Sequence, residues 1–287
     1  MNVLINPLTA LHLGKMSELE HRLDSSKKFL TNTSNLKVPD GVDFLHLGHS
    51  LNYIEAIKQA SNLTGNFYGT HFTSQSYDVA KRGVELSILA AETKSFVLTR
   101  PPGHHAGYNL PSKRIGLGDC IFNNVAIASK YLRNQGKKVL VLDIDLHQGN
   151  GTQDILGDEE NIVVVDTSQK SYWPWYESTS KNCVNVQFQK GVADEEYLKG
   201  LKSNLIPLLK QFKPDVIGVS AGFDAHLLDR SYLVDPLHSN DLSYFNLTNK
   251  SFSEIHNIIQ NYPHFAVLEG GYNSESVCNG IEIFTTD

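Results

Sequence analysis

The sequence predicts an α/β fold with a mainly parallel sheet and helices on both of its faces. Short apolar segments rich in β-branched residues recur along the chain, and stretches with helical periodicity lie between them. Most of the short segments are apolar at every position, which is typical of strands that helices cover on both sides. An alternation of strands and helices favours a parallel sheet.

The predicted strands cover residues 3–5, 96–99, 139–142, 162–165, 184–186, 216–219 and 265–268. The predicted helices cover residues 17–29, 50–60, 77–92, 123–132, 194–212 and 243–259. The helix over 194–212 carries Leu198, Leu201 and Leu205 on one stripe, with Asp194 as its expected N-cap. Glycine and proline cluster where the strands end, so we expect the loops that carry polar motifs at one edge of the sheet, where α/β proteins bind ligands.

The chain has 287 residues, which allows one large domain or two small ones at roughly 150 residues per domain. It shows no internal repeat and no linker rich in glycine, serine or proline. The formal net charge of −6 argues against a protein that binds nucleic acids through its overall charge, because neutralising phosphates requires a basic surface.

No stretch approaches the roughly 20 apolar residues that span a bilayer. Residues 1–7 do not resemble a secretory leader, because Asn6 and Pro7 interrupt the apolar run. Cys120, Cys183 and Cys278 are widely spaced and odd in number, which argues against a disulfide framework. These observations favour a cytoplasmic protein, and they leave open export to a host by a route without a cleaved leader.

An apolar strand runs directly into Asp143, Asp145 and His147, which are spaced at i, i+2 and i+4. If the strand continues, the three side chains share one face. Two carboxylates and an imidazole at one point are costly without a cation, and a divalent metal relieves the repulsion between the carboxylates. A solvated strand end that caps the following helix is the alternative. The interpretation of residues 149–152 as a phosphate-binding loop is weaker, because the lysine of a P-loop is missing.

Two adjacent histidines, His104 and His105, follow the predicted strand over 96–99 in a loop that contains two prolines. Histidine is the side chain best suited to exchange protons near neutral pH, so the pair is a candidate for acid–base catalysis. Surface histidines without a role are the alternative interpretation.

Two further polar residues follow predicted strands. Asp224 comes after the strand over 216–219, where it is either a metal ligand or a turn residue. Tyr272 follows Gly270 and Gly271, which allow a sharp turn. Its phenol is either a hydrogen-bond donor to an oxyanion or a packed side chain whose hydroxyl caps the turn. We assign no role to His226.

Together, these loops resemble the zinc-dependent histone deacetylase superfamily, which also includes the acetylpolyamine amidohydrolases. The matching segments occur in the family's order and are Arg100-Pro-Pro-Gly-His-His-Ala, Cys120-Ile-Phe-Asn-Asn-Val-Ala-Ile-Ala, Asp143-Ile-Asp-Leu-His-Gln-Gly-Asn-Gly-Thr-Gln, Ser220-Ala-Gly-Phe-Asp-Ala-His and Leu268-Glu-Gly-Gly-Tyr-Asn. The first and third segments look more like the class II and bacterial branches than like class I. The resemblance implies a single arginase/deacetylase-like α/β catalytic domain over residues 1–287, with an eight-stranded, mainly parallel sheet and helices on both faces.

The resemblance makes Asp145, His147 and Asp224 the metal ligands, with one coordination position left open, as in catalytic zinc sites. Zn²⁺ is the expected metal, at one ion per chain, and two carboxylate ligands also suit Fe²⁺. Many members of the superfamily also bind a structural monovalent cation such as K⁺, which the backbone carbonyls of residues 143–147 could hold.

The resemblance also implies that His104 and His105 take a proton from the attacking water and deliver one to the leaving amine. Asp143 corresponds to the partner of His104, and Asn150 corresponds to the partner of His105, where class I members have an aspartate. Because an amide cannot stabilise an imidazolium by charge, we predict a lower pKa for His105 than for His104. Tyr272 corresponds to the donor that stabilises the transition state.

The resemblance further implies that Gly118, Asp119 and Trp173 line the substrate tunnel. Family members usually have an aromatic residue at the position of Asp119, and a carboxylate beside an alkyl chain is costly unless it is paired. Either Lys113 or Arg114 neutralises this carboxylate, or the substrate brings a cation, as an acetylated polyamine does.

The resemblance therefore implies a zinc-dependent amidohydrolase that removes an acetyl or related acyl group from an amine, either an N-acyl-lysine or an acetylated polyamine. The alternative is a catalytically silent module of the same fold that binds acyl-lysine. We expect no direct binding to nucleic acids or membranes, and the sequence predicts no oligomeric state.

Overall fold

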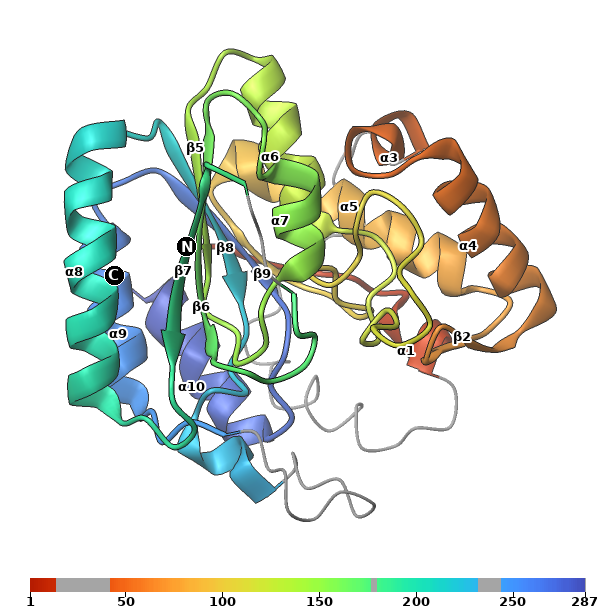
Figure 1. The fold of residues 1–287 in the computed structure, drawn as a ribbon. Helices are drawn as coiled ribbons and strands as arrows, with labels where there is room; N and C mark the ends of the chain where they lie inside the picture. The colour runs from red at the N-terminus through yellow and green to blue at the C-terminus, as the bar shows by residue number, and fades with distance from the viewer. Residues whose placement is uncertain (14–41, 177–179, 232–243, 287) are drawn as a thin grey trace.

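The centre of the protein is a parallel sheet that helices flank (Figure 1). Its strand order is β1-β4-β9-β8-β5-β6-β7. The computed structural model describes residues 1–13, 42–176, 180–231 and 244–286. Within these residues the strands of the sheet are β1 (Val3–Ile5), β4 (Phe96–Leu98), β5 (Val139–Asp143), β6 (Ile162–Gln169), β7 (Cys183–Phe188), β8 (Val216–Ala221) and β9 (His264–Leu268). Each of them overlaps a strand that the sequence predicts.

The eight-stranded sheet that we expected is not found in the described part of the chain, where the main sheet has 7 strands. Two additional strands, β2 (Gly65–Phe67) and β3 (Thr70–Phe72), pair with each other as a separate antiparallel hairpin. Between them, Tyr68 and Gly69 have φ angles of 50° and 84°, and two consecutive positive angles suit a tight hairpin turn. This turn lets the two strands pair with each other, and they do not pair with the main sheet.

Helices cover both faces of the sheet (Figure 1). One face carries α8 (Asp194–Phe212), α9 (Asn249–Ile259) and α10 (Ser274–Thr285), and the other carries α5 (Ser76–Thr93), α6 (Asn124–Asn134) and α7 (Asn150–Leu156). Outside α5 and α6 lie α3 (Val42–Gly48) and α4 (Leu51–Leu63), while α1 (Thr9–Leu13) contacts α5 and the 3-10 helix η2 (Leu227–Ser231) contacts α10. None of the helices in the described ranges is long and apolar enough to cross a membrane.

Strands β4, β5, β8 and β9 are buried on both faces, as their composition predicts, whereas the edge strand β7 exposes Asn185 and Gln187. Along β5, Leu140 and Leu142 pack in the core beneath α8, α9 and α10, whereas Val139 and Val141 pack in the core beneath α5 and α6. Burying a valine or leucine side chain contributes ~1.5–3 kcal/mol. These contacts fix the position of β5 and of the polar loop that follows it.

The predicted helices over 50–60, 77–92, 123–132 and 194–212 are confirmed as α4, α5, α6 and α8. The predicted helix over 17–29 lies outside the described residues. The prediction of a helix over 243–259 is wrong in its first part, because α9 begins at Asn249. Before this helix, Phe245 and Leu247 are buried, Leu247 pairs with His226 in a β-bridge, and the Thr248 side chain caps α9.

Asp194 is not the N-cap of α8, contrary to our prediction. Ala193 occupies that position, and Asp194 is the first helical residue. The Asp194 carboxylate accepts hydrogen bonds from the N–H of Thr248 at 2.9 Å and from the hydroxyls of Thr248 and Ser251 at 2.7 and 2.6 Å. The side chain therefore joins the starts of α8 and α9 instead of capping its own helix.

Candidate active site

Four loops bring the polar motifs together at the carboxyl edge of the sheet. The loops follow β4, β9, β8 and β5, which are consecutive in the sheet although they are far apart in the sequence. In this order the loops carry His104, Tyr272, Asp224 and Asp145. The sheet order therefore places side chains from distant segments next to one another.

Asp145, His147 and Asp224 form a compact set of possible metal ligands. One ligand atom from each of them lies within 4.8 Å of the other two. The Nδ1 atom of His147 is 3.2 Å from Oδ1 of Asp145 and 3.0 Å from Oδ2 of Asp224. Both aspartates are buried, and within the described residues neither forms an ion pair with a lysine or arginine. Two buried carboxylates and an imidazole fit a divalent ion that prefers nitrogen and oxygen ligands.

These ligand groups converge through turns after the strand. β5 ends at Asp143, and its Oδ1 atom accepts the N–H of Asp145 at 3.1 Å. Oδ1 of Asp145 then accepts the N–H of His147 at 2.8 Å. Hydrogen bonds from a carboxylate to the backbone two residues later are typical of Asx turns. Our explanation of the spacing by a shared strand face is therefore wrong, because the strand does not continue past Asp143.

A glycine makes room for the two candidate ligand carboxylates. The N–H of Gly270 donates to Oδ2 of Asp145 at 2.8 Å, and a Cβ atom at this position would lie 2.5 Å from Oδ2 of both Asp145 and Asp224. Any other residue would displace these carboxylates. The N–H of Leu146 donates to Oδ1 of Asp224 at 2.9 Å, so backbone groups orient both side chains.

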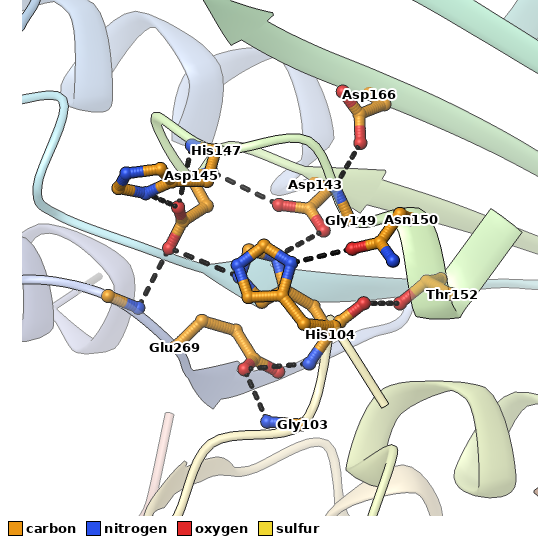
Figure 2. Close-up of polar contacts among 12 residues, drawn as sticks. Gly103, His104, Asp143, Asp145, His147, Gly149, Asn150, Thr152, Asp166 and Glu269 are labelled. Atoms are coloured by element: carbon orange, nitrogen blue, oxygen red, sulfur yellow. Dashed lines mark hydrogen bonds and ion pairs between the residues drawn. The ribbon is translucent and has the colours of Figure 1, made fainter. Parts of the chain in front are cut away.

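His104 and His105 lie side by side and have different partners. The Nδ1 atom of His104 is 3.1 Å from Oδ2 of Asp143, and its Nε2 atom is 3.8 Å from Oδ2 of Asp145 (Figure 2). The Nδ1 atom of His105 is 2.8 Å from Oδ1 of Asn150. The two ring centroids are 4.0 Å apart. Because Nδ1 is occupied in both rings, Nε2 is the atom that remains to exchange protons.

These surroundings shift the pKa values of the two histidines in opposite directions. Burial alone would lower the pKa of His104, but the negative charges of Asp145 and Asp143 outweigh it and hold this pKa well above 6.5. Burial lowers the pKa of His105 well below 6.5, and the neighbouring His104 and His147 lower it further. In the metal-free protein His104 is therefore protonated at neutral pH and His105 is neutral, in the order that their partners predict.

Glu269, to which our sequence analysis assigned no role, holds the histidine loop (Figure 2). The side chain is buried, and its Oε2 atom accepts the N–H groups of Gly103 at 2.7 Å and His104 at 3.1 Å. Nη1 of Arg100 donates to its backbone carbonyl at 3.0 Å. Burial raises the pKa of Glu269 to about 7. An acidic residue at the end of an apolar strand is the signal that could have identified Glu269, because the same signal identifies Asp143.

Asp229 holds the turn that carries Tyr272. Its Oδ1 atom accepts the N–H groups of Tyr272 and of Asn273, the second at 2.9 Å, and its Oδ2 atom accepts the hydroxyl of Ser276. Asp229 is fully buried. No local pattern indicates this residue, because its partners lie 43 to 47 positions later in the chain.

A cavity of about 200 Å³ borders the candidate ligands. Tyr272 lines it, and so do Gly118, Asp119 and Trp173, the three residues that we expected in the tunnel. The ring centroids of Trp173 and His105 are 4.4 Å apart. The structure therefore brings the predicted tunnel residues next to the histidine pair.

Asp119 is exposed at the rim of this cavity. In the described ranges its carboxylate forms no ion pair with Lys113 or Arg114, so the local salt bridge that we considered is not found there. The guanidinium of Arg114 lies instead over the ring of Trp175, at 5.2 Å from its centroid. Exposure to water lowers the cost of leaving the Asp119 carboxylate unpaired.

A second group of side chains, His104, Cys120 and Glu269, also has the spacing of metal ligands. It fits a metal less well, because burial raises the pKa of Cys120 well above its usual value and the thiolate is the form that binds metals. Two backbone N–H groups occupy Oε2 of Glu269, so Oε1 is its one carboxylate oxygen without a hydrogen-bond partner among the described residues.

Comparison with known proteins identifies the family. A sequence profile described as the histone deacetylase domain matches residues 12–287. The chain belongs to the histone deacetylase family. This family member is 34% identical over 258 residues to a probable deacetylase of Methanothermobacter thermautotrophicus, with 83% of this chain and 73% of that protein covered. It is 32% identical over 244 residues to an uncharacterised protein of Methanocaldococcus jannaschii, with 78% of this chain and 67% of that protein covered.

The fold of this histone deacetylase family member also matches a crystal structure. The HD domain of HDA15 aligns with a TM-score of 0.81, covering 99% of this chain and 88% of that chain at 23% identity. The α/β fold and the family resemblance predicted from the sequence are confirmed.

Proposed function

We propose that this member of the histone deacetylase family is a metal-dependent amidohydrolase that removes an acetyl or related acyl group from an amine. The observation that carries the proposal is the position of the histidine pair beside the ligand set of Asp145, His147 and Asp224. The relative named a probable deacetylase supports it. The amine is either a lysine side chain or a polyamine.

The proposed metal ligands are Asp145, His147 and Asp224, with Zn²⁺ as the first choice and Fe²⁺ as the alternative. When bound, a divalent ion at such a site lowers the pKa of a water molecule and polarises a carbonyl group. His147 would bind through Nδ1, the atom that faces both carboxylates. We extend the proposal to a structural K⁺ near residues 143–147, where the buried Oδ1 of Asp166 has no hydrogen-bond partner among the described residues.

The protein's own side chains handle the protons in this proposal. His105 is neutral, so its Nε2 atom can accept a proton from the attacking water. In the metal-free protein the charges of Asp145 and Asp143 favour the protonated form of His104. We propose that its contact with Asp143 keeps it protonated when a metal occupies the ligand set, so that its Nε2 atom can donate a proton to the leaving amine. Asp143 and Asn150 hold Nδ1 of the two rings and thereby orient them.

Tyr272 is the proposed hydrogen-bond donor to the oxyanion that develops at the substrate carbonyl. It lines the cavity together with His104 and His147, and Asp229 fixes its backbone N–H. A donor of this kind contributes ~2.7–4 kcal/mol to transition-state stabilisation.

Gly118 and Trp173 are proposed to flank the alkyl chain of the substrate. The backbone of Gly118 has a φ of 54°, and a Cβ atom there would lie 2.4 Å from the ring of Trp173. A side chain at position 118 would therefore close the passage. Asp119 follows at the rim, where it meets the part of the substrate that extends beyond the amine.

Turnover assays on the metal-loaded chain test the proposal. We expect deacylation of acetyl-lysine peptides, longer acyl-lysine peptides or acetylated polyamines, and we expect a chelator to abolish it and added zinc to restore it. The cavity of about 200 Å³ is smaller than typical ligand pockets of ~300–1,000 Å³, which favours acetyl over long acyl groups. No turnover of any of the three classes, with zinc or with ferrous iron, contradicts the proposal.

A further inference from the structure

A second, larger cavity adjoins the candidate active site, and we call it the side groove. Its volume is about 780 Å³, and Gly118, Asp119 and Trp173 line both it and the catalytic cavity. This volume lies within the range of pockets that bind ligands, ~300–1,000 Å³. A substrate whose acyl group occupies the catalytic cavity can therefore extend past these three residues into the side groove.

The walls of the side groove are joined by hydrogen bonds. The β2–β3 hairpin supplies one wall and residues 113–116 supply another. The N–H of Leu117 donates to the carbonyl of Tyr68 at 2.9 Å, which joins these two segments. Nε1 of Trp173 donates to the carbonyl of Ile115 at 2.9 Å and thereby attaches the wall shared with the catalytic cavity. These hydrogen bonds hold the walls of the side groove in place relative to one another.

The charges along the side groove are mainly positive. Lys113 and Arg114 are exposed along it, and in the part of the chain that the structure describes neither of them forms an ion pair with a carboxylate. The stacking of Arg114 over Trp175 orients its guanidinium. Asp119 is the only carboxylate among the described residues that line the groove, and it lies where the groove meets the catalytic cavity.

We propose that the side groove binds the peptide segment beside an acylated lysine and favours an acidic residue in that segment. This inference rests on the proposed function. An acidic side chain complements Lys113 and Arg114, whereas the further ammonium groups of a polyamine are repelled by them. The exposed carboxylate of Asp119 can accept an N–H group of the peptide backbone. The substrate class is therefore an acyl-lysine in an acidic sequence, and not an acylated polyamine.

Competing substrates test this inference on the full, metal-loaded chain. Three acetyl-lysine peptides differ only in the residues that flank the lysine, which are glutamate, glutamine or lysine, and a mono-acetylated polyamine is the fourth substrate. We expect kcat/KM to be about two- to fivefold higher for the glutamate peptide than for the lysine peptide, as exposed charge pairs allow. The ratio falls when the salt concentration rises, because salt screens exposed charges.

Two variants assign this preference to the groove. Lys113→Glu is expected to abolish or reverse the preference for the glutamate peptide. Lys137→Glu makes the same change of charge at an exposed lysine that precedes β5, at the opposite edge of the sheet, and is expected to retain the preference. Lys113→Gln, which is milder, is expected to weaken the preference and replaces Lys113→Glu if that variant does not fold.

The outcomes separate the two proposals. If none of the four substrates is deacylated, the proposed function fails. The groove inference fails, while the deacylase function stands, if the peptides are deacylated without a preference or if the lysine peptide or the polyamine is preferred. It also fails if Lys137→Glu changes the ratio as much as Lys113→Glu.

Discussion

The Nδ1 atom of His105 faces the side-chain amide oxygen of Asn150 at 2.8 Å, so a neutral group orients this imidazole. The adjacent His104 faces the carboxylate of Asp143 instead. The two histidines therefore differ in charge at neutral pH although they are neighbours in sequence and in space.

Replacing Asn150 by aspartate tests this relationship. A carboxylate at this position is expected to raise the pKa of His105 by ~1–3, because a negative charge nearby favours the imidazolium. If neutral His105 is the base, the acid limb of the kcat/KM profile moves to higher pH. NMR titration and the pH–rate profile measure both effects, with Asn257→Asp on the exposed side of α9 as the matched control. A wild-type His105 that titrates above His104 contradicts the assignment.

Metal uptake is expected to release a proton from His147. In the metal-free protein burial lowers the pKa of this histidine, but hydrogen bonds to Asp145 and Asp224 outweigh burial and raise it to about 9. The imidazole is therefore protonated at pH 7 and must lose a proton to bind a metal, so affinity rises by about tenfold per pH unit up to that pKa. Calorimetry in buffers of different ionisation enthalpy measures the released proton. Affinity that does not change between pH 6 and 8 would overturn this prediction.

Tyr272→Phe separates an enzyme from a module that only binds acyl-lysine. Loss of the phenol is expected to lower kcat by ~10²–10³ while substrate affinity changes little, because the hydrogen bond acts mainly in the transition state. Tyr108→Phe, at an exposed tyrosine outside the cavity, is the control. Equal activity of the two variants excludes the proposed role of Tyr272.

Glu269→Gln is expected to retain the hydrogen bonds of the histidine loop, because both N–H groups bind the single oxygen Oε2 and the amide oxygen can replace it. Glu269→Ala removes this acceptor and should lower the free energy of unfolding by ~1–3 kcal/mol. Turnover and chemical denaturation of both variants test the positioning role, which fails if glutamine and alanine have the same effect.

The raised pKa of Glu269 predicts that the stability of the protein depends on pH. Burial raises the pKa of Glu269 from 4.5 to about 7, so the folded state favours the protonated acid. Its contribution to stability is complete below the unfolded-state pKa and is lost as the pH rises through 7. Glu269→Gln should therefore gain stability relative to the wild type between pH 5 and 8, and a constant difference across this range contradicts the shift.

Asp119→Asn removes the carboxylate at the rim and fits the backbone, because asparagine tolerates the φ of 61° at this position. Lys113 and Arg114 already disfavour an acetylated polyamine, and Asp119 is the one carboxylate of the described groove lining that its ammonium groups can pair with. We therefore expect the low kcat/KM for this substrate to fall by about a further two- to fivefold relative to an uncharged acetyl-lysine peptide, because an exposed charge pair is lost. Asp119→Phe tests whether an aromatic wall has the same effect. An unchanged ratio shows that Asp119 does not select the substrate.

The strands and the longest helices can be predicted from the sequence because their signals are local. Leu140 and Val141 are apolar on opposite faces of β5, so the segment reads as a buried strand whatever its neighbours are. The β2–β3 hairpin was missed because its strands are 3 residues long and its turn contains Tyr68 and not an asparagine or aspartate before the glycine. Helix α7 was missed because 7 residues are too few to show a helical period.

The candidate site was predictable where polar residues follow an apolar strand, as Asp143, Asp145 and His147 do. Its supporting contacts were not, because they join a carboxylate to backbone N–H groups far away in the sequence. Glu269 binds Gly103 across 166 positions, and a backbone N–H leaves no trace in the sequence. The family resemblance supplied the remaining assignments, such as Trp173, that neither spacing nor periodicity indicates.

The place of β9 in the sheet has a consequence for synthesis of the protein on the ribosome. Among the described strands, β9 is the last in the sequence, yet it lies between β4 and β8. Until it emerges, the sheet is divided into two parts whose facing edges have no partner, and such edges are prone to pair with other chains. Insertion of β9 closes this gap and brings the His104 loop next to the loop of Asp224, so completion of the sheet and assembly of the candidate site coincide.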